Sequence, residues 1–152
     1  MSTTVVPAGP RLASGIDPRG PRFSATLTSV VLAGVLVAPT AVALWLLAAQ
    51  AAVFASGTAR GIQHTPYAWL FRSLVRPRLS APSELEDPAP PRFAQAVGLG
   101  FALVGLVGFV VGVLPLALVA TGLALAAALL NAVFGFCLGC EIYLLLTRAT
   151  TR

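Results

Sequence analysis

The chain has 152 residues, of which 57% are hydrophobic and only 10% are charged, whereas a soluble domain carries about 25% charged residues. So few charges cannot cover a water-facing surface, and the hydrophobicity also excludes disorder over most of the length. The composition therefore predicts the lipid bilayer as the partner. All ten basic residues are Arg, but no basic aromatic surface accompanies them, so we expect no nucleic acid to bind.

The chain begins with a segment, residues 1–22, that is rich in Pro and Gly and carries three Arg. This composition predicts a flexible arm ahead of a single membrane domain at residues 23–148. Near the end of the arm, Asp17 is expected to pair with Arg19 or Arg22, or to cap a turn.

Two long stretches without charged residues follow, at residues 23–59 and 93–140. A membrane-spanning helix needs about 20 apolar residues, so each stretch is too long for one crossing. Each also has a Pro near its middle, Pro39 and Pro115, that can make a turn. We predict an all-α integral membrane protein with two Pro-turn hairpins, whose four transmembrane helices cover about residues 25–38, 41–57, 94–113 and 116–136. The hairpins share this plan, but we expect no residue-level repeat between them.

The first stretch has two alternative interpretations, a single kinked span and a cleavable signal peptide. A signal core has about 7–15 apolar residues, far fewer than this stretch. Kinked spans would divide the Arg residues evenly between the two sides of the membrane. Hairpins instead place the N-terminal arm, the segment 58–92 and the C-terminus on one side, together with all ten Arg. The positive-inside rule favours the hairpins, so we predict a multi-pass protein of the cell (plasma) membrane with both termini in the cytoplasm.

The cytoplasmic segment 58–92 contains one helical pattern. Thr65 is a good N-cap and Pro66 fits the first helical position. Apolar residues then recur with helical spacing, at Tyr67, Leu70, Phe71, Leu74 and Val75. Arg72 and Arg76 fall on the other side, and Pro77 is expected to end the helix. This predicts a short amphipathic helix that lies in the headgroup layer or packs on the end of the bundle.

The only two Cys of the chain, Cys137 and Cys140, form a C-x-x-C motif near the cytoplasmic end of the fourth predicted span. On a continuous helix both thiols share one face. The spacing allows a disulfide at a helix start, or two thiolate ligands for a soft metal. Because cytoplasmic thiols are kept reduced, a permanent disulfide is not expected, which leaves a transient disulfide, a persulfide carrier or a metal pair.

The residues around the motif set expectations for its chemistry. We expect Cys140 to be the more exposed thiol and Cys137, nearer the helix interior, to be the resolving one. Gly139 lies between them and is expected to leave the thiols open to a partner. Glu141 is a candidate base for thiolate formation, or a partner for an Arg such as Arg148 or Arg22.

A metal site needs more ligands than one chain supplies, since the only His is His64. The metal-binding alternative therefore uses Cys137 and Cys140 from each chain of a homo-oligomer. A third alternative is a structural or scaffolding protein in which the two Cys only pack. The chain has no Walker loop, no G-x-S-x-G and no H-E-x-x-H motif, so no cofactor is expected, and the sequence leaves open whether the protein is an enzyme.

Several segments together resemble a known family. They are Ile16-Asp17-Pro18, Arg22-Phe23, Arg76-Pro77-Arg78-Leu79, Pro91-Arg92-Phe93-Ala94 and the run 131–143, which ends in Phe-Cys-x-Gly-Cys-x-x-Tyr. Across about residues 15–148 the chain resembles the bacterial integral-membrane domain-of-unknown-function family 4395. The resemblance implies a membrane protein that works beside thioredoxin-like or sulfurtransferase proteins. The resemblance supplies no reaction. The C-x-x-C pair leads us to predict a thiol redox or sulfur-handling accessory membrane protein that acts through Cys137 and Cys140.

Overall fold

The computed structural model describes residues 15–152, and nearly all of this part of the chain is helical. In chain order the helices are α1 (Arg19–Val37), α2 (Thr40–Arg60), η1 (Ile62–His64), α3 (Pro66–Leu70), η2 (Phe71–Val75), η3 (Arg76–Arg78), α4 (Ala89–Val110), α5 (Leu114–Phe134) and α6 (Leu138–Thr150). Four of them, α1, α2, α4 and α5, are long and apolar enough to cross a membrane. The predicted all-α class with four such helices is confirmed.

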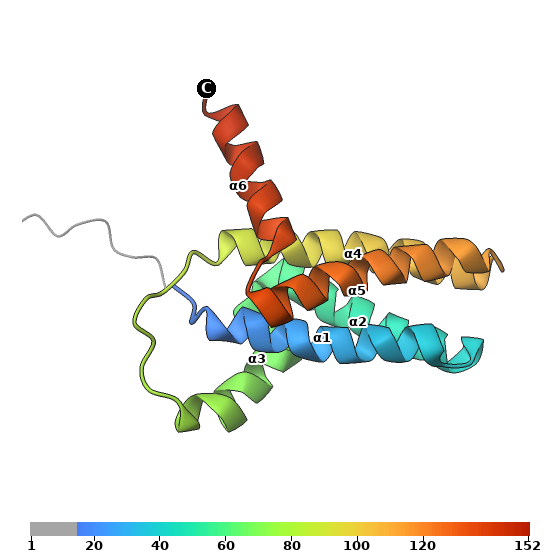
Figure 1. Cartoon of the computed structure of the whole chain (residues 1–152), viewed down its shortest axis with the longest axis horizontal. Coiled ribbons are helices and arrows are strands. Elements are labelled where there is room, and N and C mark those ends of the chain that lie inside the picture. The colour runs from blue at the N-terminus through green and yellow to red at the C-terminus, as the bar shows by residue number, and fades with distance from the viewer. Residues whose placement is uncertain (1–14) are drawn as a thin grey trace, which may run out of the picture.

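The four long helices lie side by side as two antiparallel hairpins (Figure 1). Helix α1 packs on α2 and α5, and α4 packs on the same two helices. Pro39 immediately precedes α2, and Pro115 lies in the first turn of α5, where a missing N–H breaks no helical hydrogen bond. Both Pro residues therefore belong to turns between helices, and the single kinked span is wrong.

The helix ends differ from the predicted ones. The sequence places the first two spans at 25–38 and 41–57, whereas α1 and α2 have 19 and 21 residues, which is about 30 Å at 1.5 Å per residue. They are longer because Arg19, Arg22 and Arg60 lie in the terminal turns, where a long side chain can reach the polar layer. Helix α1 begins at Arg19, within the range 1–22 predicted as an arm; residues 1–14 of that range lie outside the described part.

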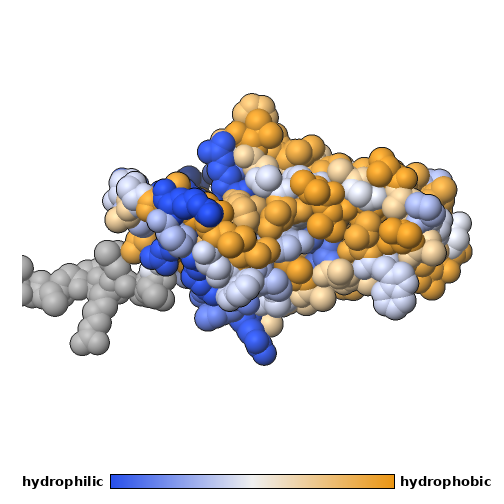
Figure 2. All heavy atoms as spheres, turned by 90° about the horizontal axis from the view of Figure 1, so that it is seen from below, coloured by the Kyte–Doolittle hydropathy of each residue, from blue (hydrophilic) through white to orange (hydrophobic). Residues whose placement is uncertain are grey.

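The bundle core consists of small residues and a few larger aliphatic ones. The most deeply buried apolar side chains include Leu32, Ala43, Leu47, Ala102 and Ala117. Small residues let helix backbones approach closely, which is how helices associate in lipid. Large apolar side chains point outward, for example Trp45, which is 79% exposed. Figure 2 shows apolar surface over most of the bundle and hydrophilic atoms gathered near one end, a distribution that fits hydrocarbon around the helices.

One end of the bundle, called the polar end below, carries the charged segments. The starts of α1 and α4, the ends of α2 and α5, the segment from η1 to η3 and the start of α6 meet there (Figure 1). The opposite end holds only the α1–α2 and α4–α5 turns, which contain no charged residue. Of the nine Arg within residues 15–152, seven lie at the polar end, in terminal turns of the spanning helices or in η2 and η3, as the hairpin arrangement requires. Arg148 and Arg152 lie at the far end of α6, which begins there.

The short helix of the middle segment begins as predicted. Thr65 caps α3, and its Oγ1 accepts a hydrogen bond from the N–H of Ala68 at 3.2 Å. The helix then continues as η2 and η3 to Arg78, past Pro77, because Pro is tolerated in the first turn of η3. Phe71 is buried and Trp69 is exposed, so the segment packs on the polar end and leaves one side open.

The sequence D-P-x-x-P-R-F occurs twice, at residues 17–23 and 87–93, so the expectation of no residue-level repeat is wrong. The two copies make the same local contacts. Asp17 accepts a hydrogen bond from the N–H of Arg19 at 3.0 Å, and Asp87 accepts one from the N–H of Ala89 at 2.9 Å. In each copy the carboxylate thus binds an N–H that the first turn of a spanning helix leaves free.

The Arg of each copy binds the end of a helix from the other hairpin. Arg22 donates to the carbonyl oxygens of Ala132 at 3.0 Å and Val133 at 2.7 Å, at the end of α5. Arg92 donates in the same way to two carbonyl oxygens at the end of α2, at 2.6 and 2.9 Å. The carbonyls of a last helical turn lack intrahelical partners and carry partial negative charge, so each Arg stabilises a helix end and joins the two hairpins.

The second helix of each hairpin also ends in the same way. Gly61 after α2 and Gly135 after α5 have positive φ values of 96° and 68°, which glycine adopts without strain. A new helix then starts, with Thr65 as N-cap in the first half and Cys137 in the second. The chain leaves the bundle on opposite sides through these helices, α3 and α6 (Figure 1).

Aromatic pairs fix both of these helices to the bundle. Phe71, six residues after the first N-cap, packs on Phe23 with ring centroids 5.8 Å apart. Tyr143, six residues after the second N-cap, packs on Phe93 at 5.7 Å. Each pair uses the Phe of its own copy of the motif, so the motif positions both the spanning helix and the short helix.

The two halves meet at the residues that precede the motifs. Ile16 and Glu86 exchange both backbone hydrogen bonds at 2.9 Å. Such reciprocal pairing of equivalent residues is what an approximate twofold axis along the bundle produces, as in parallel repeats of membrane proteins. Residues 16–78 are called repeat 1 below, and residues 86–148 repeat 2.

Candidate functional site

The C-x-x-C motif lies in a break between two helices. Helix α5 ends at Phe134, because Gly135 turns the chain and its N–H donates to the carbonyl of Asn131 at 2.9 Å. Helix α6 begins at Leu138, with Cys137 as N-cap and Cys140 in the first turn. The expectation that one continuous helix carries both Cys is wrong, and with it the position of Cys137 in a helix interior.

Cys137 and Cys140 are joined by a disulfide, with their Cα atoms 5.2 Å apart, within the usual range for such bonds. The N–H of Cys140 also donates to Cys137 Sγ at 3.3 Å. Both residues are partly exposed, so neither is a core residue. The spacing allows a disulfide at a helix start or a pair of metal-binding thiolates, and the structure has the disulfide. The sequence predicted a pair that is mainly reduced and forms a disulfide only transiently.

The disulfide lines a cleft of about 330 Å³ at the polar end. Three acidic residues line it as well, Glu86, Asp87 and Glu141. Glu141 lies in the first turn of α6, where a negative charge interacts favourably with the helix dipole. Within residues 15–152 it forms no ion pair with Arg148 or with Arg22, and Arg22 is bound to the end of α5 instead.

Close packing holds the start of α6 in place. A Cβ on Gly139 would lie 2.7 Å from both Cα and Cβ of Ala94 in α4, closer than real side chains approach. Gly139 therefore allows α6 to contact α4 directly, and the Tyr143 ring on Phe93 adds a second contact one turn further on. Gly139 thus has a packing role that the sequence did not predict, and its expected role in leaving the thiols open stays a prediction.

Sequence reasoning missed Glu86 and Asp87, because they lie in a Pro-rich segment that reads as a plain linker. The signal that could have found them is the repeat. Asp87 occupies the position of Asp17, and Glu86 occupies the position of Ile16. Asp17 pairs with Arg19, one of the two partners expected for it, and lines a different pocket, in repeat 1.

A metal site within one chain finds no support in residues 15–152, where no three His, Cys, Asp or Glu side chains come together to hold an ion. His64 lies in η1 and does not line the cleft. A disulfide also cannot ligate a metal, because the thiolate is the ligand. The metal alternative therefore needs both a reduced pair and a second chain.

These features define a class, that of a four-helix membrane protein with a C-x-x-C pair at the polar end of its bundle. The chain belongs to the family described as a domain of unknown function, DUF4395, whose model matches residues 16–148. No curated protein and no solved structure matches the chain.

Proposed function

We propose that the protein is a thiol–disulfide exchange protein of the cell membrane, and that Cys137 and Cys140 are its redox-active pair. The observation that carries the proposal is the disulfide itself, formed by the only two Cys of the chain in a cleft that is open at the polar end. A disulfide that only stabilised the fold would be expected to close a long loop, whereas this one closes a single helical turn that α4 already holds in place.

The N-cap position assigns the roles of the two thiols. In the reduced protein the N–H of Cys140 can donate to a Cys137 thiolate, and the helix N-terminus favours negative charge there. We therefore assign Cys137 as the attacking thiol and Cys140 as the resolving one, the reverse of the assignment made from the sequence. We propose that Glu141, in the same turn, accepts the proton of Cys140.

The exchange runs in two steps. The Cys137 thiolate attacks one sulfur of a disulfide in the partner, so that a mixed disulfide forms and the partner's other sulfur leaves as a thiolate. Cys140 then loses its proton and attacks Cys137 Sγ, which releases the second sulfur of the partner as a thiolate. Two electrons pass to the partner, which takes up two protons and becomes a dithiol, while Cys137 and Cys140 become the disulfide of this structure.

The acidic lining of the cleft supports a choice of partner. A surface with Glu86, Asp87 and Glu141 attracts a basic face and repels an acidic one. We propose a thioredoxin-like or sulfurtransferase partner with basic residues around its own Cys. Such a partner is in the cytoplasm if the polar end faces inward, which the gathering of seven Arg at that end supports.

Trapping of the mixed disulfide tests the proposal. In native membranes, Cys140→Ser removes the resolving thiol, so we expect a covalent complex with a thioredoxin-like partner that dithiothreitol releases. Cys137→Ser, which keeps one thiol in the same cleft, is the matched control and should trap nothing. If the Cys140→Ser variant yields no complex, and the wild-type pair keeps one oxidation state across glutathione buffers of different potential, the proposal is wrong.

The same preparations separate the two other functions. Elemental analysis of the reduced, purified protein would detect a metal bound between two chains, which would favour the dimeric site. A double variant, Cys137→Ser with Cys140→Ser, that leaves thiol-stress tolerance of the cells unchanged would favour a structural role. Labelling by a membrane-impermeant maleimide from one side reports which way the polar end faces.

A further inference from the structure

Repeat 1 has a pocket of its own at the polar end, with a volume of about 300 Å³. The start of α1, the buried side of the η1–α3–η2 segment and the linker near Leu85 form its walls. Its position corresponds to that of the Cys cleft in repeat 2. Asp17, Pro21 and Ala68 line the pocket, and the equivalent residues Asp87, Pro91 and Cys140 line the cleft.

The charge of this pocket is positive. Arg72 and Arg76, one helical turn apart, both line it. The Arg72 side chain donates to the backbone carbonyl of Gln63, which uses one of its five N–H groups. The Arg76 side chain forms no hydrogen bond or ion pair with any residue in the range 15–152. Donors therefore remain free on both guanidinium groups.

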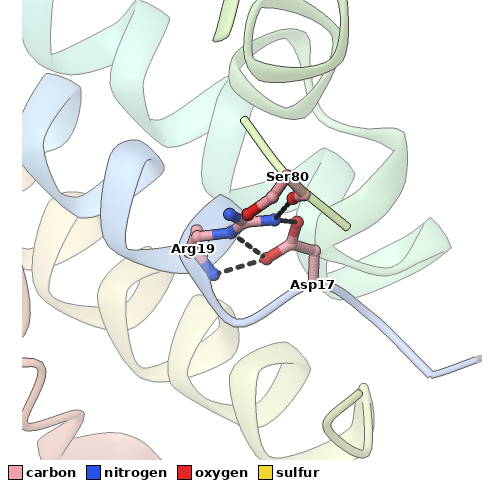
Figure 3. Close-up of polar contacts among 3 residues, drawn as sticks. All are labelled: Asp17, Arg19 and Ser80. Carbon is pink, nitrogen blue, oxygen red and sulfur yellow. Dashed lines mark hydrogen bonds and ion pairs between the residues drawn. The ribbon is translucent and has the colours of Figure 1, made fainter. Parts of the chain in front are cut away.

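The one carboxylate in the pocket wall is already neutralised. Arg19 forms a bidentate ion pair with Asp17, in which Nε donates to Oδ1 at 3.0 Å and Nη2 donates to Oδ2 at 2.9 Å (Figure 3). The same Nη2 also donates to the carbonyl of Ser80 at 2.8 Å. The hydrogen bond from Arg19 lowers the pKa of Asp17, so the ion pair persists at neutral pH. Asp17 also attracts Arg76, but its charge is balanced by Arg19, so Arg72 and Arg76 leave the pocket with a net positive charge.

Two buried polar atoms in the pocket wall have no partner among residues 15–152. Ser24 lines the pocket and is only 4% exposed, and its Oγ makes no hydrogen bond to this described part of the chain. Gln63 also lines the pocket, and its Oε1 is likewise buried without a partner there. Buried polar groups are nearly always hydrogen-bonded, so a free hydroxyl and a free amide oxygen beside a cationic pocket point to a ligand that supplies both acceptors and a donor.

We infer that the repeat 1 pocket binds a phosphate ester, with Arg72, Arg76 and the Ser24 hydroxyl on the phosphate oxygens and Gln63 Oε1 accepting from a hydroxyl of the ligand. Arg binds phosphate in a bidentate manner. Three donors from three side chains match the several oxygens of a phosphate better than the two oxygens of a carboxylate. This site does not depend on the proposed redox function.

The place of the pocket favours two sources of such a ligand, an anionic lipid headgroup and a soluble phosphate ester. The pocket lies at the polar end, next to α3, whose Trp69 side chain is 61% exposed. Exposed Trp is typical of the membrane–water interface, so α3 and the pocket beneath it lie at the depth of lipid headgroups. The experiment below distinguishes the two sources.

Binding is measured on the full-length protein in a neutral detergent, with phosphatidylglycerol by native mass spectrometry and with glycerol 3-phosphate by calorimetry. We expect the double variant Arg72→Gln with Arg76→Gln to weaken binding at least tenfold. The matched control, Arg60→Gln with Arg148→Gln, removes the same charge from residues outside the pocket and should stay within twofold of wild type. Lipid binding alone identifies a headgroup site, and binding of both probes identifies a site for the phosphate ester itself.

A milder variant keeps the test valid if the double variant unfolds. Ser24→Ala removes one donor from the pocket wall and should weaken binding severalfold, whereas Thr26→Ala, on the exposed side of the same helix, should not. Binding of neither probe to wild type would overturn the inference. Equal losses in the pocket variants and their controls would also overturn it, because they would show attraction by overall charge only.

Discussion

The two pockets at the polar end occupy equivalent positions of the repeat and differ in almost every property that governs chemistry. Where repeat 1 has Ala68 and Arg72, repeat 2 has Cys140 and Leu144. Arg19, which neutralises the Asp of repeat 1, has Ala89 as its counterpart. The pocket of repeat 1 is cationic as a result, and the cleft of repeat 2 is acidic and holds a disulfide.

The two repeats share the contacts that build the backbone, here called the plan, but differ in the side chains that line their pockets. The plan consists of the motif Asp that caps a spanning helix, the motif Arg that binds the opposite hairpin, and an N-cap that starts a short helix. These parts are shared by both repeats. The chemistry depends on the side chains that the plan leaves free, mainly at the N-cap, at the third residue after it and at the seventh.

The largest expected effect comes from moving the Cys pair between the repeats. Thr65→Cys with Ala68→Cys, in a chain that also carries Cys137→Ser and Cys140→Ser, should form a disulfide in repeat 1. The reason is that Thr65 Oγ1 already accepts from the N–H of Ala68, as Cys137 Sγ does from that of Cys140. The measurement is a maleimide gel shift of the oxidised protein before and after reduction.

The control for this exchange is Thr65→Cys with Tyr67→Cys, whose side chains point away from each other on a helix and should stay reduced. A pair at 65 and 68 that also stays reduced under oxidising conditions would show that the two N-caps are not equivalent, and the comparison of the repeats would fail at its main point.

Much of the bundle could be predicted from the sequence, because charge and Pro placement report on it directly. Charge-free length predicted the two hairpins, and the Arg distribution predicted which ends meet. The limits of the spans were less certain, since Arg19 and Arg60 can sit within terminal turns. The start of α3 was predictable, because Thr65 followed by Pro66 is a local capping signal.

The site was harder to predict, because its geometry depends on one residue and on long-range contacts. The break between α5 and α6 depends on the φ of Gly135, yet Gly also occurs inside helices here, as at Gly105. The acidic lining depends on the pairing of Ile16 with Glu86, which brings a distant segment beside the Cys pair. The D-P-x-x-P-R-F repeat was visible in the sequence and would have indicated that pairing.

The next largest effect is expected at the contact between α6 and α4. Gly139→Ala places a Cβ 2.7 Å from the Cα of Ala94, and overpacking of this kind costs about 2 kcal/mol. Thermal unfolding in detergent should show the loss, and the reduced Cys pair should react faster with maleimide as α6 loosens. Gly122→Ala, where a Cβ meets nothing within 4 Å, is the matched control. A Gly139→Ala protein as stable as that control would contradict the packing role.

A smaller and symmetric effect is expected from the motif Arg residues. Arg22→Lys and Arg92→Lys keep the charge but lose the second hydrogen bond to a helix end, which should cost at most about 1 kcal/mol each because the contacts are exposed. Denaturation of both variants in one detergent checks the value. Arg60→Lys serves as the control. Clearly unequal losses at Arg22 and Arg92 would show that the hairpins do not support each other equally.

The smallest expected effect separates the two influences of Glu141 on the Cys pair. Its negative charge opposes a nearby thiolate, so Glu141→Gln should raise the alkylation rate of reduced Cys137 at neutral pH about threefold, the size of a solvent-screened interaction between charges a few ångströms apart. The same change removes the proposed proton acceptor of Cys140, so closure of the disulfide should become slower. Quenched time courses measure the alkylation rate of Cys137, and reoxidation after removal of dithiothreitol measures the rate at which the disulfide closes. Glu84→Gln, outside the cleft lining, should alter neither rate. If Glu141→Gln changes the alkylation rate and the reoxidation rate in the same direction, Glu141 acts through its charge alone and not as a base. The negative charge of the cleft is then what distinguishes repeat 2 from repeat 1.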